Sequence, residues 1–398
     1  MLPAGYLCKK HLIQKGNPMS VCKEYEEELL FLRHWLHQYP ELSMEETRTT
    51  QFIYDYLTNL GISCYKAGET GVIGTIMVNP SYQTIAIRSE IDGLPIEEAT
   101  GLPFSSKIPG QMHACSHDAI TAVNLCLAKI LAEHKELLTC NVRFLFEPGE
   151  ETGQGAKHMI SHGGLGNPKV DGLLIFHFGN QETRHMEIQK TITTAAVGGI
   201  TLHVKGKASH WFQPQDGIDA LYAASRLAVE IHHLNQTLKT KYPFVLGFGT
   251  LQAGTAGNIV ADTAQLYGSL RAFTMEDFQF VWKELEAVMK KIEEETGAEI
   301  TLEPGRMIPP FINDADLVKR GTAIGQKLMG AHFSLGEEPF LVGDNAAFYM
   351  EQVPGMRAVF LAKKPDQPNY PVHNPAFDLD ESVLIDALEF LFHMVTEP

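Results

Sequence analysis

Apolar residues in the first half of the chain fall into short, uninterrupted runs. The runs do not alternate with polar residues, and they lie at 72–78, 84–88, 142–146 and 172–176. Such runs are typical of strands that are covered on both faces. Between the second and third runs, apolar residues recur at helical spacing from Ile120 to Leu131. Strands alternating with helices predict an α/β domain with a central, largely parallel or mixed sheet.

Two helices are expected before the first strand. Residues 24–38 form an amphipathic pattern that should end before Pro40, because the residue preceding a proline is disfavoured in a helix. Ser43 and Glu46 match the S-x-x-E capping box and predict the start of a second helix, which Gly61 would close. Residues 1–19 show no clear period, and we interpret them as a loose N-terminal extension.

The order of predicted strands and helices changes near residue 190. The order strand, helix, strand, strand, helix, strand is typical of a ferredoxin-like β-α-β-β-α-β unit. Its strands are expected at 199–206, 244–252, 263–273 and 299–304, and its helices at 217–234 and 275–297.

After Pro309 and Pro310 the α/β pattern resumes, with a helix at 314–329, a strand at 358–362 and a last helix at 381–395. The simplest architecture is therefore discontinuous. It has one α/β domain of residues 20–190 and 308–398, which residues 191–307 interrupt as an inserted domain. The length of 398 residues agrees with two domains at about 150 residues or more each.

The charge of the chain limits its partners. Lys and Arg number 32 against 48 Asp and Glu, a net charge of −16 that repels phosphate backbones and anionic lipid. We therefore expect no nucleic-acid and no membrane partner. Because no transmembrane run or secretory signal pattern is evident, the cytoplasm is the expected location. The six cysteines show no C-x-x-C spacing and are expected to be mostly reduced thiols.

Residues that can bind a metal follow the ends of the predicted strands. They are Cys115 and His117 after a Gly/Pro-rich loop, Glu150 and Glu151 after 142–146, His177 after 172–176, and His373. Ligands of open α/β sheets sit beyond the carboxyl ends of the strands. Thiolate, imidazole and carboxylate are also the donors that a zinc-like ion selects. Each residue alone is more often a loop histidine, a buried thiol or a solvated acidic pair, but their coincidence favours a metal site.

Seven motifs, from about residue 25 onward, carry a family resemblance. The chain resembles the metal-dependent N-acyl-amino-acid amidohydrolases, a group with the hippurate hydrolases and auxin-conjugate hydrolases in the dimetal aminoacylase and carboxypeptidase-like superfamily. The motifs are RSEIDGLPIEE (88–98), PGQMHACSHDAITA (109–122), FLFEPGEETGQGAKHMI (144–160), HFGN (177–180), GKASHWFQPQDGIDA (206–220), GTAGNIVADTAQLYGSLRAF (254–273) and PVHNPAFDLDE (371–381).

The resemblance implies a dimetal catalytic domain with an inserted dimerisation or lid domain. It implies two divalent ions per subunit, for which zinc is the first candidate and manganese, cobalt or nickel would also suit the donors. The implied ligands are Cys115, His117, Glu151, His177 and His373, with the cysteine as the shared ligand. It further implies that Glu150 is the general base and that Asp92 supports a ligand.

In the lid, the resemblance implies that His210 reaches the partner subunit's site and donates to the oxyanion, which would require a homodimer. Asn258 and Arg271 would hold the carboxylate or backbone of a small-molecule substrate, and an arginine fork suits a carboxylate. From the residues alone, Asn258 could equally be a turn residue and Arg271 an exposed strand residue.

The expected activity is hydrolysis of the amide bond of N-acyl amino acids. The alternatives are a dipeptidase, a deacetylase of an N-acetylated diamino acid, and a catalytically silent homologue. Four residues or segments depart from the family pattern: Ser116 for glycine, Ile120 for histidine, Glu90 for aspartate, and Asp344-Asn345-Ala346 for E-D-F. Of these, Ser116, Ile120 and Asn345 raise the last alternative. Since none removes an implied ligand or the base, we expect effects on rate or substrate preference.

Overall fold

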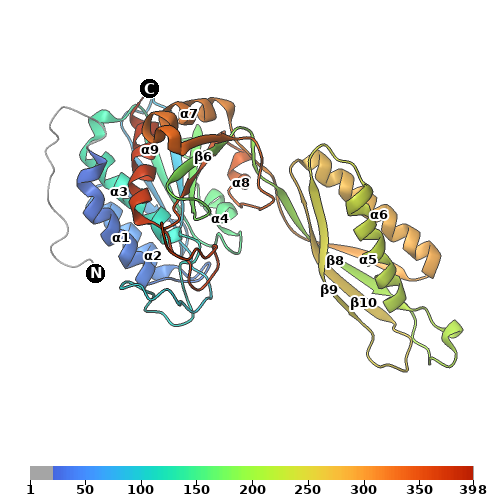
Figure 1. Cartoon of the computed structure of the whole chain (residues 1–398). Coiled ribbons are helices and arrows are strands. Elements are labelled where there is room, and N and C mark those ends of the chain that lie inside the picture. Colours follow the sequence, from blue (N-terminus) through green and yellow to red (C-terminus); the bar gives the residue numbers. More distant parts are fainter. Residues whose placement is uncertain (1–20, 398) are drawn as a thin grey trace. The chain divides into compact units, whose positions relative to one another are not determined.

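The computed structural model describes residues 21–397, which divide into two compact units (Figure 1). The larger unit contains the described residues up to Thr191, Asn313–Glu337 and the residues from Phe348 onward; the smaller contains Ile192–Ile312 and Glu338–Ala347. The extension expected at 1–19 lies outside the described residues. Among the described helices, none combines the length and the apolar character needed to cross a membrane.

Eight strands of the larger unit form one mixed sheet in the order β1-β2-β4-β3-β5-β14-β6-β13. Neighbours from β4 to β14 are parallel, whereas β2–β4 and β14–β6 are antiparallel. Every residue of β3 and β4 is buried, which explains their non-alternating sequences. The predicted α/β fold with a mixed sheet is confirmed. The strands are β1 (Ser63–Lys66), β2 (Val72–Ile76), β3 (Thr84–Glu90), β4 (Asn141–Glu147), β5 (Gly172–Gly179), β6 (His185–Gln189), β13 (Phe333–Gly336) and β14 (Gly355–Leu361).

Helices of the larger unit bury apolar faces against this sheet and one another. Helix α3 (His117–Glu133) lies between α1 and α9, as Figure 1 shows. Helix α1 buries Leu29, Leu32 and Leu36 and ends before Pro40, as predicted. Besides α3, the α-helices of this unit are α1 (Glu26–Gln38), α2 (Thr47–Asn59), α4 (Gly155–Ser161), α7 (Ala315–Met329), α8 (Ala347–Met350) and α9 (Leu384–Thr396).

The prediction of a capping box at Ser43 and Glu46 is wrong. Helix α2 begins only at Thr47, and Glu46 makes no side-chain cap. The Glu41 carboxylate instead accepts hydrogen bonds from backbone N–H groups of the first turn, including that of Thr49 at 2.7 Å. The side chains of Ser43 and Glu46 bond to residues 49 and 103 positions away in the sequence. Long-range contacts thus overrode a local signal.

The smaller unit has the predicted ferredoxin-like fold. Four antiparallel strands stand in the order β11-β8-β10-β9, and helices α5 and α6 cover one face (Figure 1). Buried positions alternate along β8, because only that face is covered. A short pair, β7 (Ile192–Thr194) with β12 (Phe311–Ile312), adjoins the chain boundaries of this unit. The main elements are β8 (Ala196–Lys205), α5 (Ala220–Thr237), β9 (Phe244–Ala253), β10 (Thr263–Ala272), α6 (Met275–Thr296) and β11 (Glu299–Ile308).

Candidate metal centre

The six donor residues of the larger unit gather into three overlapping groups. Within each group, the candidate ligand atoms lie within 4.8 Å of one another. Cys115 occurs in two groups, as do His117 and Glu151, so the groups form one continuous centre rather than three separate sites. The groups are Cys115 with His117 and His177, Cys115 with Glu151 and His373, and His117 with Glu150 and Glu151.

Ser116 has a left-handed backbone conformation, and its two neighbours, Cys115 and His117, belong to the same group of candidate ligands. Ser116 has φ 63°, a conformation that glycine adopts at no steric cost, and the chain then turns directly into α3. The Ser116 hydroxyl donates to the Cys115 carbonyl and, at 3.4 Å, to the Phe178 carbonyl. Ser116 therefore makes hydrogen bonds from a backbone conformation that is strained for a residue with a side chain.

Asp92 fixes the orientation of His117. The Nδ1–H of His117 donates to the Asp92 carbonyl at 2.9 Å and to its carboxylate at 3.1 Å. The other carboxylate oxygen of Asp92 accepts from the Glu151 backbone N–H at 3.0 Å. Nε2 of His117 is buried and has no hydrogen-bond partner among the described residues. One carboxylate thus orients the His117 ring and the Glu151 backbone, and it leaves Nε2 of His117 directed at the centre without a hydrogen-bond partner among the described residues.

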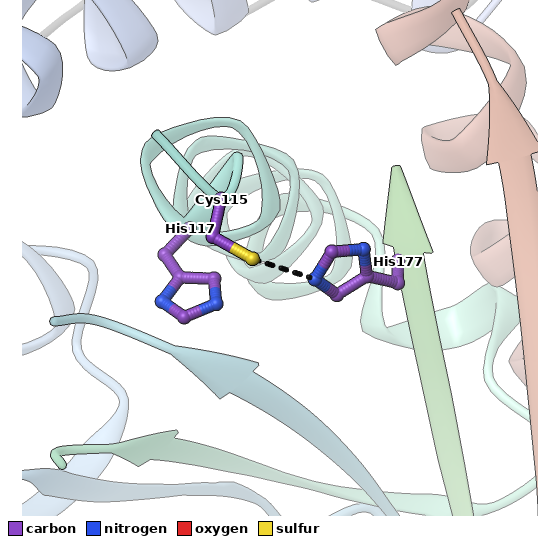
Figure 2. Close-up of side chains that lie close together, drawn as sticks. All are labelled: Cys115, His117 and His177. Atoms are coloured by element: carbon purple, nitrogen blue, oxygen red, sulfur yellow. Dashed lines mark hydrogen bonds between the residues drawn. The ribbon is translucent and has the colours of Figure 1, made fainter. Parts of the chain in front are cut away.

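The other two histidines approach Cys115 from separate segments, His177 from β5 and His373 from the loop that follows β14. His177, on β5, donates from Nδ1 to the Phe178 carbonyl at 2.8 Å, so that its Nε2 faces the Cys115 sulfur at 3.7 Å. Figure 2 shows this sulfur pointing toward His177, with His117 beside it. His373 follows β14 in a left-handed conformation, φ 66°, and its Nε2 lies 3.3 Å from Oε1 of Glu151.

The electrostatics of the centre favour positive charge. Burial raises the pKa of the Cys115 thiol, but His117, His177 and His373 outweigh burial and hold that pKa well below its usual range. Hydrogen bonds to Cys115 and Glu151 raise the pKa of His373 to about 10. A thiolate beside carboxylates makes the imidazoles of His117 and His373 hold protons in the absence of another cation. The same imbalance attracts a divalent ion, which would displace those protons.

A tight turn presents the two glutamates. Gly149 has φ 64°, and its carbonyl accepts hydrogen bonds from the backbone N–H groups of Gln154 and Gly155. A Cβ on Gly155 would lie 2.0 Å from the Pro148 carbonyl oxygen, so the turn requires glycine there. The turn directs Glu150 and Glu151 to the same group of donor atoms. Oε1 of Glu151 is buried, and the His373 imidazole lies 3.3 Å from it.

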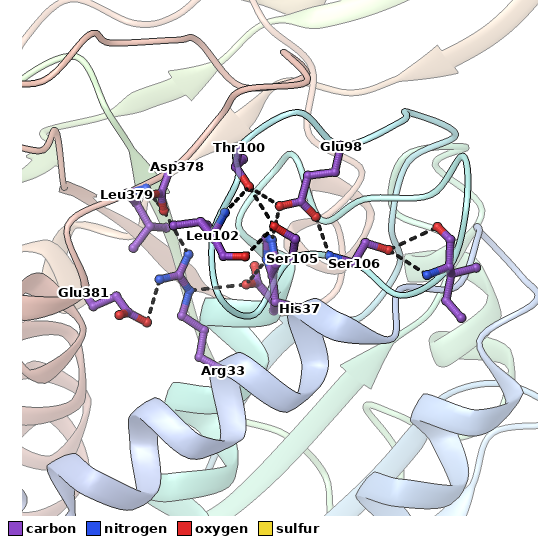
Figure 3. A network of polar contacts seen from close by, with 12 residues as sticks. Arg33, His37, Glu98, Thr100, Leu102, Ser105, Ser106, Asp378, Leu379 and Glu381 are labelled. Atoms are coloured by element: carbon purple, nitrogen blue, oxygen red, sulfur yellow. Dashed lines mark hydrogen bonds and ion pairs between the residues drawn. The ribbon is translucent and has the colours of Figure 1, made fainter.

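A buried ionic network contacts Asp118 in the first turn of α3, next to His117. The Asp118 carboxylate accepts from His37 Nδ1 at 2.8 Å and pairs with Arg33 at 3.3 Å. Figure 3 shows Arg33 reaching Asp378 and Glu381 as well, and His37 facing Glu98. Burial lowers the pKa of His37, but Asp118 and Glu98 outweigh burial and raise it to about 9. This network was not predicted, because its members come from four separate segments.

The predicted lid residues fall into two places within the smaller unit. His210 and Asn258 lie on adjacent loops: Trp211 N–H donates to the Asn258 carbonyl at 3.2 Å, and both predicted residues are exposed. Arg271 stands at the opposite end of β10, roughly 25–30 Å along the strand. Its Nη1 donates to the Leu341 carbonyl at 2.6 Å. The structure brings the first two together and separates them from the third.

The donor set fits divalent cations. Nε2 of His117, which belongs to the clustered groups, is buried without a hydrogen-bond partner among the described residues. A buried donor without a partner is costly unless an ion or water satisfies it. Cys115 could contribute to two ions, since its sulfur belongs to two groups of donors. One thiolate, three imidazoles and a carboxylate are donors typical of a transition-metal site.

Comparisons with known proteins show the family to which this chain is similar. The model of Peptidase family M20/M25/M40 matches residues 86–397. An N-acetyl-L-cysteine deacetylase of Bacillus subtilis is 32% identical over 388 residues, covering 96% of this chain and 90% of the relative. An IAA-amino acid hydrolase of Arabidopsis thaliana, ILR1-like 4, is 29% identical over 361 residues, covering 89% and 81%.

Among solved structures, the Bacillus subtilis YXEP protein, described as a dinuclear metal binding peptidase from the M20 family, has a TM-score of 0.81 at 29% identity. The match covers 94% of this chain and 98% of that one. The family match extends over most of the chain, and the deacetylase match includes the lid. This chain therefore belongs to Peptidase family M20/M25/M40, and within it to the amidohydrolases.

Proposed function

We propose that this protein is a metal-dependent amidohydrolase that cleaves N-acyl amino acids into an acyl group and a free amino acid. The observation that carries the proposal is the overlap of donor groups around Cys115, with Glu150 in the same cluster. The named relatives, an N-acetyl-L-cysteine deacetylase and an IAA-amino acid hydrolase, support an acylated amino acid as the substrate class.

In this proposal, Cys115 would contribute its sulfur to the holding of two divalent ions. His117 and His177 would complete one ion's protein ligands, and Glu151 and His373 the other's, as the two cysteine-containing groups suggest. Two bound ions would polarise the amide carbonyl and lower the pKa of a water. Zinc is our first candidate because thiolate and imidazole suit it, and manganese, cobalt and nickel are the alternatives.

Glu150 is proposed as the general base. It follows the Gly149 turn, lies in one donor group with His117 and Glu151, and is not needed by either of the cysteine-containing groups. A carboxylate so placed can take a proton from the attacking water and deliver it to the leaving nitrogen. Glu151, its neighbour, is held by the Asp92 contact to its backbone and would remain a ligand.

The lid residues are proposed to bind substrate across a homodimer. Arg271 would pair with the carboxylate of the substrate, and Asn258 would hold its backbone. His210 would donate to the oxyanion in the partner subunit's site. The separation of Arg271 from His210 and Asn258 along β10 supports a division of these roles between two subunits. The cytoplasmic location stays a prediction.

The test is Glu150→Gln, assayed on a panel of N-acyl amino acids and on free dipeptides. We expect kcat to fall by about 10³-fold or more, because the base is lost, while metal content and thermal stability stay unchanged. Glu69→Gln, which changes an exposed glutamate, is the matched control. Unchanged turnover in Glu150→Gln would exclude this base. Wild-type cleavage of dipeptides alone would favour a dipeptidase, since only a dipeptide presents an α-ammonium group.

A further inference from the structure

Ser43 and Glu46 bind two different parts of the metal centre. The Ser43 hydroxyl donates to the Asp92 carboxylate at 2.7 Å. The Glu46 carboxylate accepts from the Gly149 backbone N–H, also at 2.7 Å. Asp92 accepts hydrogen bonds from the His117 ring and from the Glu151 backbone, and Gly149 directly precedes Glu150. The segment between α1 and α2 therefore contacts both the support of the ligands and the turn that carries the proposed base.

The burial of Glu46 argues against a role in helix capping. Glu46 is 0% exposed, and its Oε2 has no hydrogen-bond partner among the described residues. Burial, with a contribution from Asp92, raises its pKa to about 7. Burying a carboxyl group is unfavourable unless the group is hydrogen-bonded, as Glu46 is to the Gly149 N–H. The neighbouring Glu45, by contrast, is exposed to solvent.

The backbone between the two contacts is strained. Met44 has φ 66°, a region that residues with side chains rarely occupy. Its side chain packs against the Gly149 turn, where a Cβ added to Gly149 would lie 2.6 Å from the Met44 sulfur. Strain of this kind persists where the surroundings determine the conformation. Here Ser43, directly before Met44, and Glu46, two residues after it, are both hydrogen-bonded to the centre.

We propose that Glu46 is a positioning residue for hydrolysis: by accepting the Gly149 N–H, it fixes the turn that places Glu150. Ser43 assists from the same segment by holding Asp92. The inference rests on the proposed function, because it gives Glu150 the role of base. A displacement of a catalytic group by about 1 Å can cost roughly 100-fold in rate, so a single hydrogen bond to the turn can matter without touching substrate.

The test compares Glu46→Met, which keeps the side-chain volume but removes the acceptor, with Glu46→Gln, which retains a side-chain carbonyl oxygen. We expect Glu46→Met to lower kcat by about 30-fold to 100-fold, with KM and metal content within about twofold of wild type. Glu46→Gln should restore kcat to within about threefold. Glu45→Ala is the matched control and should leave all values unchanged. Equal kcat for the Met and Gln variants would overturn the proposal.

A second measurement does not depend on turnover. Hydrogen–deuterium exchange in the peptide covering residues 147–154 should become faster in Glu46→Met and stay at the wild-type rate in Glu46→Gln. Unchanged exchange in Glu46→Met would contradict the positioning role. If the wild type hydrolyses no N-acyl amino acid, the proposed function fails, and exchange alone decides whether Glu46 holds the turn.

Ser43→Ala provides an independent variant if Glu46→Met does not fold. It removes one of the hydrogen bonds to Asp92 and leaves those from His117 and Glu151. We expect kcat to fall by about threefold to tenfold at unchanged KM. A kcat equal to that of the wild type would overturn the assisting role of Ser43.

Discussion

The metal centre and the His210 loop of the lid are built in opposite ways. In the metal centre, His117 and His177 each donate their Nδ1–H to a fixed acceptor, and Asp92 aligns two donors at once. In the lid, His210 and Asn258 are exposed, and backbone hydrogen bonds join their loops. The first arrangement is ordered before any substrate arrives. The second presents its side chains outward, as expected of groups that act on something outside their own unit.

The strongest test of this difference removes the shared donor. Cys115→Ala should reduce the content of both ions and lower kcat by about 10³-fold or more, because its sulfur belongs to both cysteine-containing groups. Metal analysis by mass spectrometry, together with kinetics, measures both effects. Cys64→Ala, a half-buried free cysteine on β1, is the control. Two ions retained in Cys115→Ala would show that the cysteine is not shared.

The lid should respond differently. His210→Ala is expected to lower kcat by about 100-fold, the usual effect of losing one oxyanion donor, while metal content and melting temperature stay unchanged. His203→Ala, which changes another lid histidine paired with exposed Glu303, is the control. A fall in metal content in His210→Ala would abolish the contrast between the two regions.

Mixing two inactive variants would sharpen the comparison. If His210 acts in the partner's site, mixed dimers of His210→Ala and Glu150→Gln contain one site with both residues intact. Activity should therefore reappear after the chains are exchanged under mild denaturation and refolded together. A mixture as inactive as its parents, with mixed dimers demonstrated by native mass spectrometry, would place His210 in its own subunit's site.

The buried network behind the centre makes a prediction about pH. His37 has a pKa of about 9, above the value near 6.5 expected in the unfolded chain, so folding favours its proton. Its stabilisation is fully present below pH 6.5 and is lost as the pH rises through 9, by up to about 3 kcal/mol. Urea unfolding of wild type and His37→Gln at pH 6.5 and 9 measures this. The wild type should lose more stability than the variant; equal losses would refute the assignment.

The smallest expected effect concerns Arg271. Its Nη1 already donates to the Leu341 carbonyl, so lysine keeps the charge but loses the planar fork. Arg271→Lys should raise KM for N-acyl amino acids by about tenfold and change kcat by less than about threefold. Kinetics on a substrate and on its carboxamide, which lacks the carboxylate, provide the control. A KM ratio between the two substrates that matches the wild type would exclude Arg271 as the carboxylate partner.

The sequence predicted the parts of the fold that depend on hydrophobic burial. Runs such as 84–88 and 142–146 are apolar because β3 and β4 are buried on both faces, and the lid order followed from clear strand and helix patterns. Short elements were missed. Strands β6 and β13 have five and four residues, too few to show a period, and their pairing joins segments about 150 positions apart.

The candidate donors could be predicted, but their supports could not. Cys115 and His373 stood out because metal-binding side chains follow strand ends, and the family resemblance added their roles. The contacts of Ser43, Glu46 and His37 involve partners 49 to 103 positions away, which no local pattern specifies. The S-x-x-E motif was misread for this reason: its spacing fits a cap, while its side chains are used elsewhere.

The lid is encoded in two pieces. Besides Ile192–Ile312 it contains Glu338–Ala347, where the Ala195 N–H donates to the Val342 carbonyl at 2.9 Å and Arg271 binds Leu341. A recombinant lid made from the first piece alone would lack these partners. Exchanging lids between family members requires both pieces to be transplanted together, so natural recombination at one pair of crossover points would produce mismatched chimeras.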